Sequence, residues 1–311
     1  MFEILGIELT EECIADCPHC FRSKTGRVMN GETLKKIMDE AASHKISFIV
    51  FTGGEPFLER DLLFEGARLA NLYKIPFAVN TTFFPATQSD IEDLAKLDPF
   101  RTTVSVHASD AAYHDKVTGI EGSFEKVVRD IQLASDLKIV VFAHMVVTAS
   151  NVGRMKETAR FFYDLDAGFM ATRVGGGFGR FLNRESYLKY LEYCSDLIGE
   201  GISVGHDDCY PLCGMTENPW RAKHDCPGGS TMVTVNPEGI IRPCARMPHL
   251  SCGSISEGLE KAWTATENWR NRSLLPGACH GCEKLSACGG GCRAEALFAM
   301  SAINSIDPYS G

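Results

Sequence analysis

Three cysteines near the start of the chain are spaced so that they can hold a metal centre. Cys13, Cys17 and Cys20 form the pattern Cys-x3-Cys-x2-Cys, directly after the first apolar segment. Three thiolates at this spacing can bind one face of a cubane iron–sulfur cluster and leave one iron without a protein ligand. A structural zinc ion would require four ligands, so a zinc half-site is the alternative for the same residues. His19 places a flat side chain beside this centre.

A second motif follows the second apolar segment. Gly53, Gly54, Glu55 and Pro56 stand in sequence after Phe51-Thr52. Paired glycines at the carboxyl end of a strand let a ligand approach the backbone closely, and the Glu55 carboxylate can receive an ammonium group. The alternative is a tight turn between strand and helix, in which the glycines serve geometry only.

The cysteine content of the whole chain favours metal binding over disulfide cross-linking. The 311-residue chain has 13 cysteines, of which three lie within 13–20 and nine within 209–292. Disulfide scaffolds are typically small, secreted and evenly cross-linked, whereas this chain is long and opens without the basic segment of a signal peptide. We therefore expect a cytoplasmic protein whose thiolates hold metal.

The composition argues against two classes of partner. The formal net charge is −9, from 31 lysines and arginines against 40 aspartates and glutamates, which argues against nucleic acid. No apolar run approaches the roughly 20 residues of a membrane span, so we expect no membrane partner. Hydrophobic residues make up 44% of the chain and charged residues 23%, as in ordinary globular proteins.

Strand and helix patterns alternate over the first two-thirds of the chain, and they must position both motifs. Apolar segments rich in β-branched residues predict six strands, at Phe2–Leu9, Ser47–Phe51, Pro76–Asn80, Thr102–His107, Ile139–Thr148 and Gly168–Val174. Helical patterns lie between and after them, at Gly31–His44, Arg60–Tyr73, Gln88–Lys96, Ser123–Leu137, Asn151–Leu165 and Asn183–Gly199. This alternation predicts an α/β fold of parallel strands, and six repeats fit a partial (β/α)6 TIM-like barrel better than a complete one of eight.

The composition changes near Ser203, where glycine, proline and cysteine become frequent. Thr231–Val235 and Gly239–Arg242 predict a β-hairpin around a proline–glycine turn. A region with so small an apolar core needs another source of stability, which metal clusters on its cysteines can supply. We therefore predict two domains, a barrel at 1–202 and a small cysteine-rich domain at 203–311.

The two N-terminal motifs together resemble those of the radical S-adenosylmethionine (SAM) superfamily, over residues 1 to about 200. The resemblance implies that Cys13, Cys17 and Cys20 bind a [4Fe–4S] cluster whose open iron is chelated by SAM. It implies reductive cleavage of SAM to methionine and a 5′-deoxyadenosyl radical, which abstracts a substrate hydrogen. By the same resemblance, the segment 53–56 contacts the methionine amino group, and His19 takes the usually aromatic position beside the adenine.

The resemblance implies further SAM contacts at the ends of later strands. Asn80 ends the third predicted strand, where the family often carries an asparagine. Ser105 and His107 lie on the fourth, where polar groups commonly reach the ribose. A capped strand end or an inward polar residue bonded to backbone is the alternative for each. Arg173, at the end of the sixth strand, could bind a carboxylate, and the glycine run 175–177 after it could be a flexible loop over the site.

The C-terminal cysteines resemble the SPASM extension of radical SAM enzymes, which carries one or two auxiliary [4Fe–4S] clusters. The pattern is Cys226-x12-Gly239-x4-Cys244, then Cys-x2-Cys-x5-Cys-x3-Cys over residues 279–292. The resemblance implies a first auxiliary cluster on Cys226, Cys244 and Cys292, with Cys209 or Cys213 as fourth ligand. It implies a second cluster, on Cys279, Cys282 and Cys288.

This sequence departs from the SPASM pattern after Cys292, because the last 19 residues contain no cysteine. The second auxiliary cluster then has a non-cysteine ligand, an open iron, or a ligand borrowed from Cys209 or Cys213. A zinc ribbon on the four cysteines of 279–292 is the alternative.

Two cysteines fall outside these motifs. Cys194 lies in a helical pattern and is interpreted as a packed small residue. Cys252 is either a fourth cluster ligand or an unligated thiol that faces the substrate. In the second case it is a candidate catalytic residue, a hydrogen-atom donor to a substrate radical, as in related epimerases.

The sequence leaves the substrate open. The favoured prediction is modification of a ribosomally made peptide, by epimerisation, thioether formation or carbon–carbon cross-linking, because SPASM proteins commonly do this. The alternative is epimerisation or dehydrogenation of a small metabolite such as an amino sugar or cyclitol. A non-enzymatic iron–sulfur electron carrier is the third class, but it does not explain the segment 53–56.

Two protein partners are expected. The resemblance implies a flavodoxin- or ferredoxin-type electron donor. The barrel begins near residue 3, which leaves no room for an N-terminal peptide-recognition module, so a peptide substrate suggests a separate leader-binding protein.

Overall fold

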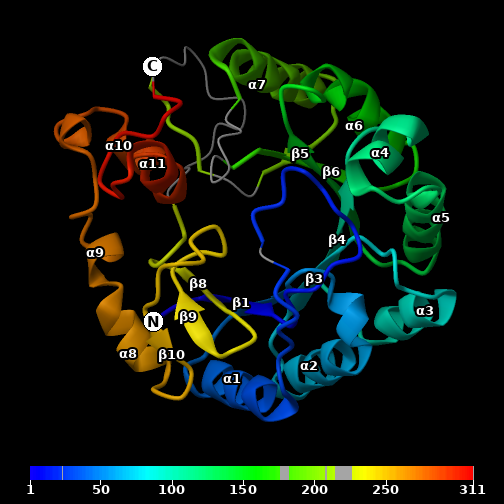
Figure 1. Ribbon diagram of the computed structural model, residues 1–311, viewed down its shortest axis with the longest axis horizontal. Coiled ribbons are helices and arrows are strands. Elements are labelled where there is room, and N and C mark those ends of the chain that lie inside the picture. The colour runs from blue at the N-terminus through cyan, green and yellow to red at the C-terminus, as the bar shows by residue number, and fades with distance from the viewer. Residues whose placement is uncertain (23, 176–181, 207–208, 214–225, 311) are drawn as a thin grey trace.

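Among the residues that the structure describes, ten strands form one curved sheet in the order β10-β9-β8-β1-β2-β3-β4-β5-β6-β7. The computed structural model describes residues 1–22, 24–175, 182–206, 209–213 and 226–310. Figure 1 shows the helices α1 to α7 along the outer side of the curved sheet. The strands are β1 (Ile4–Glu8), β2 (Phe48–Thr52), β3 (Phe77–Thr81), β4 (Arg101–Val106), β5 (Val141–Val147), β6 (Gly168–Arg173), β7 (Val204–Gly205), β8 (Met232–Val235), β9 (Ile240–Arg242) and β10 (Gly253–Ser254).

The strands β1 to β7 are all parallel to their neighbours, as expected for strands joined by crossover helices. The helices that follow them are α1 (Gly31–Ser43), α2 (Arg60–Tyr73), α3 (Gln88–Lys96), α4 (Ala111–Thr118), α5 (Ser123–Asp136), α6 (Met155–Tyr163) and α7 (Arg184–Gly199). The predicted partial barrel is confirmed, with six strand–helix repeats. The helix α4 and the two-residue strand β7 were not predicted, because both are too short to show a periodic pattern.

The two faces of the sheet have different surroundings. In β5, the side chains alternate between buried and half-buried along the whole strand. The buried face packs against the helices, as the ring of Phe51 on β2 shows, because a Cβ on Gly66 of α2 would lie 2.6 Å from that ring. The half-buried face therefore lines the inside of the barrel, where side chains can reach a ligand.

Several helices begin at a side chain that bonds their first turn. Asn30 accepts a hydrogen bond from the N–H of Thr33 at the start of α1, and Thr87 forms a capping box with Asp90 at the start of α3. Such caps stabilise a helix by about 1 kcal/mol each and fix where it starts. The cap at Asn30 thereby fixes where the segment that carries Cys13, Cys17 and Cys20 ends and α1 begins.

The C-terminal region extends the barrel sheet. The strand β8 pairs in parallel with β1, and β9 and β10 follow as antiparallel strands. Short helices complete this region: α8 (Leu259–Ala265), α9 (Glu267–Arg270), α10 (Leu285–Cys288) and α11 (Arg293–Met300). The predicted hairpin is present. Because its strand β8 pairs with β1, one sheet contains strands from both predicted domains, 1–202 and 203–311. The division into two domains stays a prediction.

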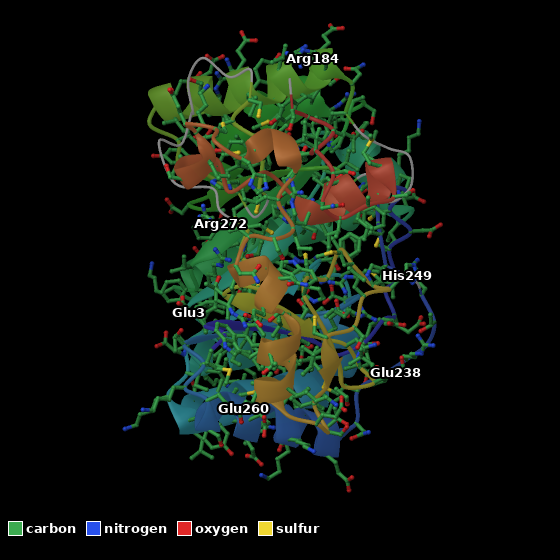
Figure 2. All side chains as sticks on the ribbon, turned by 90° about the vertical axis from the view of Figure 1, so that its left-hand side faces the viewer. Glu3, Arg184, Glu238, His249, Glu260 and Arg272 are labelled. Carbon is green, nitrogen blue, oxygen red and sulfur yellow. The ribbon has the colours of Figure 1, made fainter. Side chains whose placement is uncertain are left out.

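The helix α8 packs against the first helix of the chain. The N–H of Leu259 donates to Oε2 of Glu40 on α1 over 2.9 Å. In Figure 2, the label of Glu260 marks α8 in the lower part of the view. The C-terminal region is thus anchored at β1 and at α1. No helix among the described residues combines the length and the apolar character that crossing a membrane requires.

Candidate metal centre and cofactor site

The three N-terminal cysteines lie on a loop between β1 and α1 that folds back on itself. Thr10 and Val28 form an isolated antiparallel bridge across the base of this loop. The N–H of Asp16 donates to the carbonyl of Thr118, at the end of α4, over 2.8 Å. The cysteine loop is therefore held over the carboxyl ends of the strands, which we call the barrel mouth.

The thiols of this loop lie close together. Burial is the main cause that raises the pKa of the Cys17 thiol to about 12, and the neighbouring Cys20 and Cys13 thiols raise it further. Burial also raises the pKa of Cys13, with Glu55 and Cys20 as further causes. Metal ligation requires thiolates, so a metal bound here would release their protons. The donor set of three neighbouring thiols fits the open-iron cluster that the spacing predicts.

The glycine pair after β2 admits the backbone of the cysteine loop. A Cβ on Gly53, whose φ is +143°, would lie 2.5 Å from the carbonyl oxygen of Thr10, and one on Gly54 would lie 1.9 Å from that of Glu12. The N–H groups of Gly54 and Glu55 donate to these two carbonyls, each over 2.7 Å. The close approach that the glycines permit is thus made by the chain's own cysteine-bearing loop, and side chains are excluded for that reason.

Glu55 is fully buried, and its carboxylate accepts four hydrogen bonds. Oε1 accepts from the N–H of Phe57 (3.0 Å) and the hydroxyl of Thr81 (2.7 Å), and Oε2 accepts from the N–H and hydroxyl of Thr82, both over 2.6 Å. Burial raises the pKa of Glu55, and these hydrogen bonds oppose that rise. Glu55 therefore ties the short helix η1 (Pro56–Glu59) to the end of β3. Its predicted contact to the methionine amino group stays a prediction.

Two polar side chains on the inner face of the barrel have buried atoms without a hydrogen-bond partner in the part of the chain that the structure describes. Asn80 on β3 and Thr103 on β4 are register partners, and Oδ1 of Asn80 and Oγ1 of Thr103 are buried with no hydrogen-bond partner among the described residues. Leaving a buried polar atom unbonded costs about 1–3 kcal/mol. A polar ligand such as SAM at the barrel mouth would satisfy them, so the residues present fit that cofactor. Sequence reasoning missed Thr103, although its place two residues before Ser105 puts it on the same face of the strand.

Ser105 and His107 lie at the upper end of β4. Ser105 is half-buried and is the register partner of His144 on β5, whose Nε2 lies 2.6 Å from Oγ1 of Thr172. His107 is buried, and its Nε2 lies 3.6 Å from Sγ of Cys17. The ring of His19 packs edge-on against it, with centroids 5.0 Å apart. The structure thus brings His19 and His107 to the cysteine loop, while their predicted contacts to SAM stay predictions.

Four C-terminal cysteines gather in one group, which we call the first cysteine set: Cys209, Cys226, Cys244 and Cys292. Cys209 and Cys292 belong to one buried cluster, against which the other two pack. A hydrogen bond from the Cys209 side chain is the main cause that lowers the pKa of Cys226 to about 7. Burial and then Cys226 raise the pKa of Cys244 to about 11. Of the two predicted candidates for the fourth place, Cys209 is the one in this group.

The second cysteine set contains Cys213, Cys279, Cys282 and Cys288. Burial raises the pKa of Cys279, and the nearby groups that also act on it include the other three cysteines of this set. The N–H of Leu212 donates to Sγ of Cys288 over 3.4 Å, which brings the segment before Cys213 against this set. Cys213 thus lies near the other three cysteines of this set, and its role as the borrowed ligand of the second cluster stays a prediction.

Arg173 points at a protein carboxylate. Its guanidinium is fully buried, pairs with Asp307 over 3.1 Å and donates to the carbonyl of Cys209. Asp307 in turn accepts the N–H of Cys292 over 2.8 Å. The predicted role of Arg173 toward a cofactor carboxylate stays a prediction, but in this structure the residue joins β6 to two members of the first cysteine set. The glycine run after it lies mostly outside the described residues.

The remaining two cysteines lie apart from both sets. Cys194 is fully buried on α7, in accordance with its interpretation as a packed residue. Cys252 is buried in the main apolar core cluster. Desolvation by burial raises its pKa to about 11. The predicted role of Cys252 as a hydrogen-atom donor stays a prediction.

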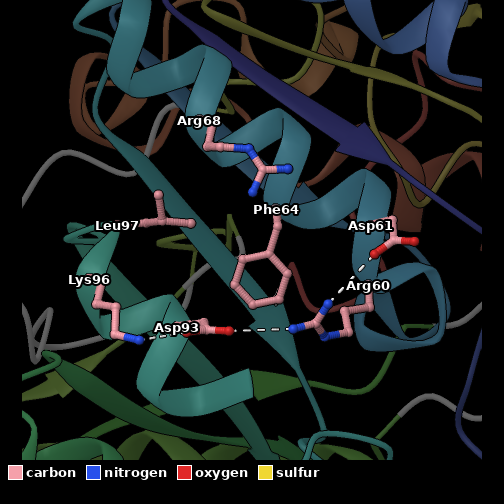
Figure 3. Close-up of a pocket in the computed structure, with 7 residues that line it drawn as sticks. All are labelled: Arg60, Asp61, Phe64, Arg68, Asp93, Lys96 and Leu97. Carbon is pink, nitrogen blue, oxygen red and sulfur yellow. Dashed lines mark hydrogen bonds and ion pairs between the residues drawn. The ribbon is translucent and has the colours of Figure 1, made fainter. Parts of the chain in front are cut away.

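A hollow of about 320 Å³ lies on the outer surface between α2 and α3 (Figure 3). It is lined by Arg60, Asp61, Phe64, Arg68, Asp93, Lys96 and Leu97. Arg60 pairs with Asp93 over 3.4 Å, and Lys96 pairs with the same carboxylate over 2.7 Å. Arg60 and Lys96 are therefore paired with a protein carboxylate, and no lining residue belongs to the cysteine loop or the sheet.

A family model described as the Radical SAM superfamily matches residues 7–162, about half of the chain. The AdoMet-dependent heme synthase of Methanosarcina barkeri is 24% identical over 334 residues, which cover 98% of this chain and 95% of that protein. The PqqA peptide cyclase of Bradyrhizobium diazoefficiens is 22% identical over 329 residues, 97% of this chain and 84% of that protein.

A solved structure of similar fold is that of Streptococcus suis SuiB bound to precursor peptide SuiA. It matches with a TM-score of 0.81 at 16% identity, covering 99% of this chain and 75% of that chain. The matched family region of this chain includes the cysteine loop, the segment 53–56 and the polar ends of β3 and β4.

Proposed function

The chain belongs to the radical SAM superfamily, and from this premise we propose that it cleaves SAM at the cysteine loop to modify a ribosomally made peptide. One observation carries the proposal: three thiols, the segment 53–56 and buried polar atoms without a hydrogen-bond partner in the described part of the chain lie together at the barrel mouth. When bound, a [4Fe–4S] cluster with SAM supplies the electron and the 5′-deoxyadenosyl radical that removes a substrate hydrogen.

The chain's own residues bind and orient these groups. Cys13, Cys17 and Cys20 would hold the cluster, and the backbone hydrogen bonds of Gly54 and Glu55 fix the loop that carries them. Asn80, with Thr103 and Ser105, would bond the polar atoms of SAM, because they line the inner face beside the loop. Holding the reacting atoms in a defined geometry inside the barrel would favour hydrogen transfer from the substrate over side reactions of the radical.

The two cysteine sets would hold two auxiliary [4Fe–4S] clusters, each with four thiolate ligands. A cluster near the substrate can accept an electron from a substrate radical, which favours net oxidation, whereas a thiol donor such as Cys252 favours redox-neutral epimerisation. The chain has candidate residues for both groups, so the proposal is limited to hydrogen abstraction followed by one of these two outcomes.

A pair of variants tests the assignment of Cys213. Cys213→Ala removes one ligand of the second cysteine set, so the reconstituted protein is expected to lose up to four irons per chain, the content of one [4Fe–4S] cluster. Cys194→Ala, which removes a buried thiol outside both sets, is the control and should keep the full iron content. Equal iron content in the two variants contradicts the assignment.

Similarity to the PqqA peptide cyclase and to SuiB, solved with its precursor peptide, supports a peptide substrate. The second candidate is a small molecule, which is favoured by the similarity to the heme synthase over 95% of that protein's length. A flavodoxin- or ferredoxin-type electron donor, and for a peptide a separate leader-binding protein, are the partners that we propose.

Formation of 5′-deoxyadenosine tests the proposed activity. Anaerobically reconstituted protein is given SAM and a reductant, and the product is measured by mass spectrometry, with Cys17→Ala as the control. We expect 5′-deoxyadenosine from the wild type only. Its absence from the wild type would favour an electron carrier. Deuterium transfer into the product from a labelled peptide, rather than from a labelled small metabolite, would identify the substrate class.

A further inference from the structure

His107 lies directly against a cysteine that the proposed function makes a cluster ligand. Its Nε2 is 3.6 Å from Sγ of Cys17, an ordinary hydrogen-bond length for the large sulfur atom. The residue itself is only 3% exposed. Cys17 is half-buried, and the histidine side of this contact is shielded from water, which strengthens a hydrogen bond.

The backbone of His107 is fixed by hydrogen bonds, and its ring is held by packing against neighbouring rings. Its N–H donates to Nδ1 of His114 on α4 over 3.3 Å, and its carbonyl accepts from Nδ2 of Asn151 over 3.5 Å. Asn151 is itself held, because its Oδ1 accepts the N–H of Thr148 over 2.7 Å. The rings of His107 and His114 also pack, with centroids 5.1 Å apart.

The direction of the hydrogen bond follows from the chemistry of a metal-bound sulfur. A thiolate has no proton to donate, so it can only accept. The proton between Cys17 and His107 must then be on Nε2, in the neutral ring or in the charged one. Nδ1 of His107 is buried and has no hydrogen-bond partner within the described ranges, so Nε2 is the ring nitrogen with a partner to bond.

We propose that His107 donates its Nε2–H to the Cys17 sulfur and thereby raises the reduction potential of the cluster on the cysteine loop. The inference rests on the proposed function, because it requires Cys17 to be a cluster ligand. Hydrogen bonds to cluster sulfurs stabilise the reduced state, which carries one more negative charge than the oxidised state. His107 is therefore a positioning residue that acts through Cys17.

A different use of the same atoms is a mononuclear metal site. The ligand atoms of Cys17, His19 and His107 all lie within 4.8 Å of one another. Such a site would use Cys17 for one ion, commonly zinc, and would leave Cys13 and Cys20 without their cluster. Metal analysis distinguishes the two arrangements.

The test compares His107→Leu, which removes the donor, with His107→Gln, whose amide can still donate. The reconstituted holoprotein is titrated reductively, and the electron paramagnetic resonance signal that responds to SAM is followed. At the potential where half of the wild-type cluster is reduced, we expect the ratio of reduced to oxidised cluster in His107→Leu to fall about tenfold, a shift of about 59 mV for one electron. His107→Gln should recover most of this loss, and His44→Gln, at the end of α1, should match the wild type.

A wild-type midpoint in His107→Leu overturns the inference while leaving the proposed function intact. One zinc per chain that is lost in His107→Leu also overturns it, in favour of the mononuclear site. If the wild type itself forms no SAM-responsive cluster, the proposed function has failed.

A measurement that keeps His107 in place tests the inference in the case in which His107→Leu does not assemble its cluster. His19 is replaced by phenylalanine, so that it cannot give the signal expected from His107. The His19→Phe protein labelled with ¹⁵N-histidine should then show a hyperfine coupling between a histidine nitrogen and the reduced cluster. Absence of this coupling overturns the inference.

Discussion

Single residues at the barrel mouth are fixed by contacts with the cysteine loop. Gly54 is the clearest case, because the backbone of Glu12 occupies the place where a side chain would begin. Glu55 is the next residue, and both of its carboxylate oxygens accept hydrogen bonds, from Phe57, Thr81 and Thr82. The motif 53–56 therefore has a structural role: it holds the cysteine loop against the sheet.

Gly54→Ala should destabilise the protein and deplete its iron. The new Cβ would lie 1.9 Å from the carbonyl oxygen of Glu12, so the loop backbone must move, at a cost of about 3 kcal/mol. Denaturant unfolding and iron analysis of the same sample measure both effects. Gly31→Ala is the matched control, since nothing lies within 4 Å of its Cβ, and its stability should change by less than about 1 kcal/mol. Equal behaviour of the two variants would show that the loop does not need this close approach.

At the scale of elements, a buried ion network joins the cysteine loop to the C-terminal hairpin. Glu8 on β1 is fully buried and pairs with Arg22 and, over 3.1 Å, with Arg242. Arg22 follows Cys20 by two residues, and Arg242 precedes Cys244 by two. Glu8 therefore links the loop of the N-terminal cysteines to the strand that leads into the first cysteine set.

Glu8→Ala should destabilise the fold by about 3–5 kcal/mol, because it leaves two largely buried arginines without their shared carboxylate. Urea unfolding measures this change. Glu260→Ala on the exposed surface of α8 is the control, and its unfolding free energy should stay within about 0.5 kcal/mol of the wild type. A loss below about 1 kcal/mol in Glu8→Ala would mean that the network does not join the two regions.

The sequence predicted the strands and helices better than it predicted which of them pair or contact one another. The six strand–helix repeats carry periodic patterns of their own, and the spacing of the N-terminal cysteines is a local signal. The parallel pairing of β8 with β1 has no such signal, because it joins segments more than 200 residues apart. The same holds for the pair of Glu8 and Arg242, and for the division of Cys209 and Cys213 between two sets. These depend on the folded chain, not on local spacing.

At the scale of the whole molecule, residues near the C-terminus connect β6, the last long strand of the barrel, to the first cysteine set. Asp307 is fully buried, where it accepts from Arg173 of β6 and from the N–H of Cys292. The ring of Tyr309 covers the Arg173 guanidinium at 4.5 Å, and its hydroxyl accepts the N–H of Leu182. Asp307 thus joins Arg173, which lies 134 residues earlier in the chain, to Cys292.

Asp307→Ala should loosen this end of the molecule. It leaves the Arg173 guanidinium buried without its carboxylate, which costs about 3–5 kcal/mol, and it removes the acceptor for Cys292. We expect lower unfolding stability together with partial loss of iron from the first cysteine set. Asp164→Ala, at the exposed end of α6, is the control for both measurements. Full iron content in Asp307→Ala would mean that the tail does not support that set.

The central claim is that the cysteine loop leaves one iron for SAM to occupy. Electron paramagnetic resonance of the reduced protein, recorded with and without SAM, tests this most directly. We expect a cluster signal that changes shape when SAM is added, and we expect that change to be absent from Cys17→Ala. A wild-type spectrum that SAM leaves unchanged, or stoichiometric zinc in place of iron on the loop, would contradict the account.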